Sequence, residues 1–167
     1  MGGGFLSARG FLLAAALAAA LLLAVGCGSS GSDTVTVETG SLSKAAFIKK
    51  ADAICKAAWS EFFAEYGVFF KAHESDLGDE SKERAMLGEV VDTLLAPNVE
   101  GAIKQISELG APNGYATEAA SYLNALQKRL GEMRAEPAEL TAGSSPFKNP
   151  RKAAEKAGLQ GCAKSFS

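Results

Sequence analysis

The stretch FIKKADAICKAAWSEFFAEYGVFF, residues 47–70, decides the fold of this chain. Its apolar residues are Phe47, Ile48, Ala51, Ile54, Cys55, Ala58, Trp59, Phe62, Phe63, Tyr66, Phe69 and Phe70. They recur every three or four positions over about seven turns, which is the spacing of an amphipathic helix. They cover about half of the helix circumference, whereas a helix that packs on one neighbour needs a narrower stripe. We therefore expect this helix to contact two neighbours at once, as in a helical bundle.

The first two helices are bounded by capping residues and turn signals. Ser43 is a good N-cap for the first helix, which should end near His73, before a polar turn that contains Gly78. Apolar residues at helical spacing resume over residues 80–109. Pro97 lies inside that run, where it removes a backbone donor and clashes with the preceding turn. Because the same apolar face continues beyond it, Pro97 predicts a kink or two helices in close succession, not a chain reversal.

Two further helices complete the predicted domain, residues 43–167. A third helix is expected over residues 115–134. A short fourth helix should cover residues 150–157, because Asn149-Pro150 places an N-cap before a proline at the first helical position. Gly158 then suits a left-handed C-cap. The fold class is predicted as all-α, an antiparallel bundle of three long helices, the second kinked, plus a short C-terminal helix.

An export signal precedes this domain. Arg9 is the only charged residue in residues 1–26. The apolar run from Phe11 to Val25 spans about 15 residues, which is short for a membrane-spanning helix of roughly 20 and typical of a signal peptide. Small residues then lead to Cys27, the arrangement that lipoprotein signal peptidase requires. We predict that residues 1–26 are removed and that Cys27 carries a lipid.

Three alternatives to a lipoprotein signal remain open. They are an ordinary secretory signal cut near Ala24 or Gly26, an uncleaved signal anchor, and a buried core helix. The predicted location is extracytoplasmic, anchored to the cell membrane by the lipid on Cys27, or secreted if the signal is an ordinary one. Residues 27–42 begin with a Gly/Ser-rich composition and are expected to form a flexible tether.

The three cysteines predict one disulfide. If Cys27 carries a lipid, Cys55 and Cys162 remain as an even pair, and the oxidising compartment of an exported protein favours their pairing. Cys55 lies within the apolar arc of the first helix, so this bond would staple the C-terminal segment to that helix. Two buried thiols are the alternative.

Composition and motifs exclude several classes of function. The chain has 17 basic and 19 acidic residues, so it lacks the basic balance that nucleic-acid binding needs. It contains no zinc-protease motif, nucleophile elbow, phosphate loop or dinucleotide fingerprint. We therefore predict no cofactor, no catalytic residue and a protein that is not an enzyme.

The single histidine, His73, lies among other residues that can ligate metals: Glu74, Asp76, Asp79 and Glu80. Their spacing does not match an EF-hand loop, and the three cysteines form no zinc-type cluster. A solvated turn is the interpretation that we adopt, because a positive charge is favoured near a helix C-terminus. No metal site is predicted.

Trp59, Phe63 and Phe70 lie toward one edge of the apolar arc of residues 47–70. Core packing is one interpretation of these rings. The other is that this edge stays partly exposed and binds an apolar ligand or a partner helix, because aromatic clusters are common at such sites. Full burial of Trp59 and Phe63 would exclude the second interpretation.

Four segments resemble a family of actinobacterial secreted proteins and lipoproteins of uncharacterised function. They are Phe47–Cys55, the turn Leu109–Pro112, Asn149–Pro150 and Ala157–Cys162. The resemblance covers most of residues 43–163 and departs from the family at Ala157, where an aromatic residue is usual. It implies a helical domain stapled by a disulfide, and it implies no activity.

These observations predict a cell-envelope lipoprotein whose domain is a non-catalytic binding or scaffolding module. An envelope protein or an apolar ligand would be its partner, besides the membrane that holds the lipid. The alternative is a carrier that holds a lipid or other apolar ligand between its helices, which requires an internal cavity of several hundred Å³. A hydrolase is a remote third alternative and would need carboxylates that converge in a cleft. The oligomeric state is not predicted.

Overall fold

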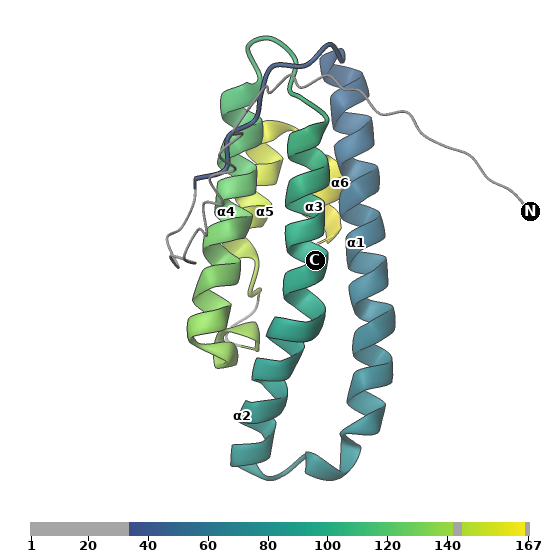
Figure 1. Cartoon of the computed structure of the whole chain (residues 1–167), viewed down its shortest axis with the longest axis vertical. Coiled ribbons are helices and arrows are strands. Elements are labelled where there is room, and N and C mark those ends of the chain that lie inside the picture. The colour runs from purple at the N-terminus through teal and green to yellow at the C-terminus, as the bar shows by residue number, and fades with distance from the viewer. Residues whose placement is uncertain (1–33, 142–144, 166–167) are drawn as a thin grey trace, which may run out of the picture. The chain divides into compact units, whose positions relative to one another are not determined.

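Helices account for the fold in the computed structural model, which describes residues 34–141 and 145–165 (Figure 1). The elements, in chain order, are α1 (Lys44–Ala72), η1 (Glu74–Asp76), α2 (Glu80–Glu89), η2 (Val90–Leu95), α3 (Ala96–Glu108), α4 (Ala116–Ala135), η3 (Pro137–Leu140), α5 (Lys148–Ala157) and α6 (Gln160–Ser165). The predicted all-α class is confirmed. Within these described ranges, no helix combines the length and the apolar character needed to span a bilayer. The expected signal peptide and Cys27 lie outside the described residues.

The first helix, α1, begins and ends where the sequence predicts. The Ser43 hydroxyl accepts a hydrogen bond from the Ala46 amide at 3.2 Å, which satisfies a free donor of the first turn. At the other end, the amide of His73 donates to the carbonyls of Phe69 and Phe70. The polar residues after His73 then turn the chain through η1 toward α2.

One stripe of α1 is buried, and the burial stops part of the way along the helix. The buried residues are Phe47, Ala51, Cys55, Trp59 and Phe62. This stripe belongs to a core that α1 shares with α3, η2 and α6, so the predicted packing against more than one neighbour is confirmed. Beyond Phe62, Phe63 and Phe70 remain 58% and 37% exposed. The helix that follows in the chain, α2, is not among the elements that pack closely on α1.

The run from α2 to α3 passes Pro97 without reversing direction (Figure 1). A π-helical turn, η2, lies directly before the proline, and Pro97 occupies the first turn of α3, where a missing N–H costs little. Side chains bond to carbonyls of the same stretch: the Thr93 hydroxyl donates to Glu89 O at 2.7 Å, and the Asn98 amide donates to Leu94 O at 2.9 Å. The expected interruption is therefore a change of helix type.

Helix α4 follows a turn in which Gly110 and Gly114 have positive φ angles of 64° and 74°. Its buried residues are Ala119, Tyr122, Leu123, Leu126, Leu130 and Met133. The burial of Tyr122 was not predicted. Its hydroxyl lies 3.2 Å from Cys55 Sγ, and the hydroxyl must be the donor because the sulfur has no hydrogen.

Residues 34–42 were expected to belong to the tether, but the structure holds them against the helical domain. The Val35 backbone bonds to the Asn124 side chain, and Val37 is buried. The Ala111 amide donates to Glu38 O at 2.8 Å, and the Gly40 amide donates to Ala111 O at 2.7 Å. This extended segment therefore pairs with a helix side chain and with a turn instead of with another strand. Hydrophobic periodicity predicts strands and helices, so it could not predict these contacts. We call residues 34–42 the N-terminal strap.

The C-terminal segment is more helical than the sequence predicts. Helix α5 begins at Lys148, two residues before the expected start, so Asn149 is not its N-cap. Gly158, at φ 78°, ends α5 as expected. After Leu159, the six residues Gln160–Ser165 form α6, which was not predicted. The disulfide Cys55–Cys162 joins α6 to α1 across a sequence separation of 107 residues, so the predicted pairing is confirmed.

Candidate functional site

A surface groove of about 530 Å³ lies between the second half of α1 and the described residues 140–141 and 145–151. Its lining residues are Trp59, Phe62, Phe63, Tyr66, Leu140, Thr141, Ser145, Pro146, Phe147, Arg151 and Ser165. Most of this lining is apolar or aromatic, and its polar groups are few. This is the character of a small-molecule site, and the volume is within the usual range of about 300–1,000 Å³.

The α1 wall of the groove is a connected row of aromatic rings. Trp59 and Phe63 have centroids 5.9 Å apart, and Phe62 and Tyr66 are stacked at 5.8 Å. Phe62 also lies 5.3 Å from Phe63. Contacts at these distances add to the stability of the row beyond the area that each ring buries. The row therefore presents a continuous apolar wall over two helical turns.

The floor of the groove is formed by Trp59 and Phe147. Their centroids are 4.9 Å apart in an edge-on arrangement, and the two residues are 9% and 5% exposed. Phe147 is the N-cap residue of α5 and was not predicted as a site residue. The available signal was one aromatic residue in a loop otherwise rich in Gly, Ser and Pro. The helix that Phe147 would reach could not be inferred from that signal.

The structure brings two of the three expected ligand-face residues into this groove. Trp59 and Phe63 line it, and Phe63 is 58% exposed, so the full burial that would have excluded a binding face is not observed. Phe70 does not line the groove. It lies one turn further along α1, with its centroid 5.9 Å from the Tyr66 ring.

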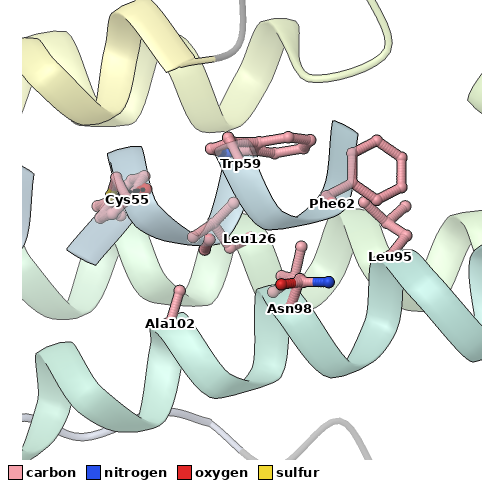
Figure 2. Close-up of a pocket in the computed structure, with 10 residues that line it drawn as sticks. Cys55, Trp59, Phe62, Leu95, Asn98, Ala102 and Leu126 are labelled. Carbon is pink, nitrogen blue, oxygen red and sulfur yellow. Dashed lines mark hydrogen bonds between the residues drawn. The ribbon is translucent and has the colours of Figure 1, made fainter. Parts of the chain in front are cut away.

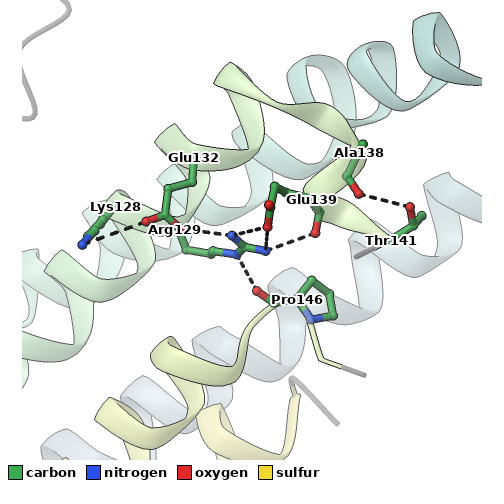
Figure 3. Close-up of polar contacts among 7 residues, drawn as sticks. All are labelled: Lys128, Arg129, Glu132, Ala138, Glu139, Thr141 and Pro146. Carbon is green, nitrogen blue, oxygen red and sulfur yellow. Dashed lines mark hydrogen bonds and ion pairs between the residues drawn. The ribbon is translucent and has the colours of Figure 1, made fainter. Parts of the chain in front are cut away.

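The opposite wall is held in place by Arg129 of α4, whose side chain is only 13% exposed (Figure 3). Its Nη2 donates to the carboxylate and the main-chain carbonyl of Glu139, both at 3.1 Å. Its Nε donates to the carbonyl of Pro146. One guanidinium therefore joins η3 to the segment that precedes α5 and sets where Leu140 and Phe147 stand.

Two buried polar atoms on groove residues have no hydrogen-bond partner within the described parts of the chain: Ser145 Oγ and Arg151 Nε. Arg151 Nε lies 3.7 Å from a carboxylate oxygen of Glu155, which is too far for a hydrogen bond. A buried donor without a partner is destabilising, and native proteins contain few of them. Both residues line the groove, where they contribute polar groups to a lining that is otherwise mostly apolar.

The interior between α1, α3 and α4 offers no comparable space (Figure 2). Trp59, Phe62, Leu95, Asn98 and Leu126 surround a cavity of about 10 Å³ there. A single water molecule needs about 10–15 Å³ by this measure, so the core is effectively solid. An apolar ligand does not fit in this cavity.

The side chains of the polar turn around His73 make separate structural contacts and do not converge on one metal-binding position. The His73 ring stacks on Phe69 with centroids 4.1 Å apart, and its Nδ1 lies 2.9 Å from Phe69 O. Asp76 pairs with Lys82 at 3.1 Å. Asp79 caps α2, and its hydrogen bonds from the Ser81 hydroxyl and nearby amides lower the pKa of its carboxyl. Among the described residues, no group of three or more His, Cys, Asp or Glu side chains is arranged to hold a metal ion.

Comparison of the chain with protein-family models, with curated proteins and with solved structures finds no match.

Proposed function

We propose that this chain is a cell-envelope lipoprotein whose helical domain is a non-catalytic binding module, and that the groove beside Trp59 is its binding site. One observation carries the proposal: Phe63 is 58% exposed on the wall of a groove of about 530 Å³ whose floor is aromatic. Leaving a phenyl ring in water at such a place is unfavourable, and exposed apolar surface of this kind marks interaction sites.

The envelope location is supported by the sequence and by the disulfide. The small residues before Cys27 favour a lipid on that sulfur, and the bond between Cys55 and Cys162 is typical of an oxidising compartment. In this proposal residues 1–26 are a signal peptide, and residues 27–33 connect the lipid-bearing Cys27 to the N-terminal strap. Replacement Cys27→Ala should move the protein from the membrane fraction to the soluble exported fraction and abolish labelling by a radioactive fatty acid. Unchanged membrane retention would contradict the anchor.

The same proposal includes the finer arrangement of the helices. The three long arms of an antiparallel bundle are α1, the run from α2 through α3, and α4, while α5 is the short C-terminal helix. The contacts of α3 with both α1 and α4, and of α5 with α4, support this order. In this arrangement the groove lies on the surface of the bundle, between α1 and the start of α5.

A carrier with its ligand between the helices is less well supported, because the cavity there measures about 10 Å³. A carrier could instead hold its ligand in the surface groove. Such a site exchanges its ligand without separation of the helices.

The proposal is tested with an apolar fluorescent dye, phenylnaphthylamine, and a matched pair of variants. Phe63 lines the groove, whereas Val68 is 73% exposed on the same helix and does not line it. Phe63→Glu should abolish dye binding because it places a charge on the apolar wall, and Val68→Glu should leave it unchanged. Equal binding by both variants and the wild type would contradict the groove as the site.

A further inference from the structure

We propose that the groove binds a single-chain amphiphile with an anionic head, of which a medium-chain carboxylate is the simplest case. Its chain lies along the α1 wall and its head at Arg151 and Ser145. This inference rests on the proposed function and adds to it the chemical class of the ligand.

The position of the head follows from Arg151 and Ser145, two of the polar residues that line the groove. The guanidinium only donates hydrogen bonds and the hydroxyl can donate as well, so an anionic oxygen is the acceptor that suits both groups. A guanidinium is also suited to two parallel hydrogen bonds with one carboxylate. Glu155, whose side chain is 52% exposed, can turn into solvent when the ligand arrives.

The charges around the groove favour a negative head over a positive one. Arg151 is the only charged side chain among the described lining residues, and no Asp or Glu is among them. The first turn of α5, which carries Phe147 and Arg151 into the groove, contains no acidic residue. The positive end of the helix dipole adds to the same field. A cationic head would find no acceptor of opposite charge in this lining.

The size of the groove fits one chain. The aromatic wall runs from Trp59 to Tyr66, a length of about 10 Å at the rise of an α-helix. The floor rings, Trp59 and Phe147, pack against each other at 4.9 Å and close the groove from below. One extended chain of medium length can therefore lie over Trp59 and Phe63, and the volume of about 530 Å³ leaves room for its head.

The test uses the fluorescence of Trp59, the only tryptophan in the chain, on the disulfide-bonded protein. Decanoate, decanol and decylammonium share one chain and differ in head charge, and each is added below the concentration at which it aggregates. We expect decanoate to bind most tightly. Arg151→Gln should weaken decanoate binding by about tenfold, as the loss of one charge-assisted hydrogen bond predicts, and should leave decanol unchanged.

Lys152→Gln is the matched control, because it removes a neighbouring exposed charge that does not line the groove. It should leave decanoate binding unchanged. If the wild type binds decanoate and decanol equally, or prefers decylammonium, the proposal of an anionic head is wrong, but the groove remains the proposed binding site. If calorimetry and fluorescence show no binding of any probe, both proposals fail. Ser145→Ala provides a second variant should Arg151→Gln fold poorly.

Discussion

Asn124, in the middle of α4, bonds to both backbone groups of Val35. Its Oδ1 accepts from the Val35 amide at 2.8 Å, and its Nδ2 donates to the Val35 carbonyl at 2.9 Å. One side chain therefore supplies both hydrogen bonds that a neighbouring strand would offer. With the bridge between Thr39 and Ala111, this pair fastens both ends of the N-terminal strap to the domain.

Asn124→Ala should release the first part of the strap. The variant loses two partly buried hydrogen bonds to Val35, so we expect a loss of about 1–3 kcal/mol in the free energy of unfolding. Urea denaturation measures the loss, and hydrogen exchange at the Val35 amide should become faster. Asn113→Ala, at an exposed turn position, is the control and should change neither value. Equal effects of the two variants would contradict the role of Asn124.

Alanine replacements at Gly40 and Gly101 should change the stability of the domain in opposite directions. A Cβ on Gly40 would lie 2.6 Å from the backbone oxygen of Gly110, which cannot move aside easily, so Gly40→Ala should destabilise by about 1–3 kcal/mol. A Cβ on Gly101 in α3 meets nothing within 4 Å, so Gly101→Ala should stabilise by about 0.5–1 kcal/mol through helix propensity. Thermal unfolding of the two variants checks both signs, and a stabilising Gly40→Ala would show that the strap does not approach the turn.

Arg129→Met should loosen the wall of the groove. The nearly buried guanidinium bonds to Glu139 and to the Pro146 carbonyl, and its loss leaves these acceptors without their donor. We expect a stability loss of about 2–3 kcal/mol and weaker dye binding, because Leu140 and Phe147 lose their fixed positions.

Arg134→Met is the control for this experiment. Arg134 is 40% exposed and pairs with Glu100 at 2.6 Å on the surface, where an ion pair contributes about 0–1 kcal/mol. It should leave dye binding unchanged. A groove that binds the dye equally well in Arg129→Met would show that the wall does not depend on this residue.

The domain should lose stability in alkaline solution. Burial, with a smaller effect of the nearby Glu118 charge, raises the pKa of Tyr115 to about 12, and burial also raises the pKa of Tyr122. The unfolded phenol ionises near pH 10.0, so between there and about pH 12 the unfolded chain releases a proton that folded Tyr115 retains. Stability is complete below that range and falls within it by about 1.4 kcal/mol per pH unit for each such tyrosine.

Tyr115→Phe isolates this effect. The variant loses the hydrogen bond from the hydroxyl to the Ala157 carbonyl at every pH, but it has no phenol to ionise at that position. Denaturation at a series of pH values should therefore give a shallower alkaline decline than the wild type. Parallel declines would show that Tyr115 does not retain its proton in the folded state.

Local signals in the sequence predicted the main elements of the fold. Ser43 and Gly158 mark helix ends because a hydroxyl cap and a positive φ angle are properties of the residue itself. The pairing of Cys55 with Cys162 was predictable by counting, since Cys27 was assigned to a lipid. The aromatic row on α1 was visible as helical spacing, and with it Trp59 and Phe63 as candidate site residues.

The tertiary structure decided which of these features meet. Val35 bonds to Asn124 across 89 positions of the chain. Trp59 contacts Phe147, a contact that could not be predicted because Phe147 lies in a turn-rich loop without helical periodicity. The groove exists because α1 and the residues around the start of α5 come together while Arg129 holds the opposite wall, and both depend on packing between distant segments. Helix ends follow from local hydrogen bonds and backbone angles, whereas a groove depends on the space that distant side chains leave between them.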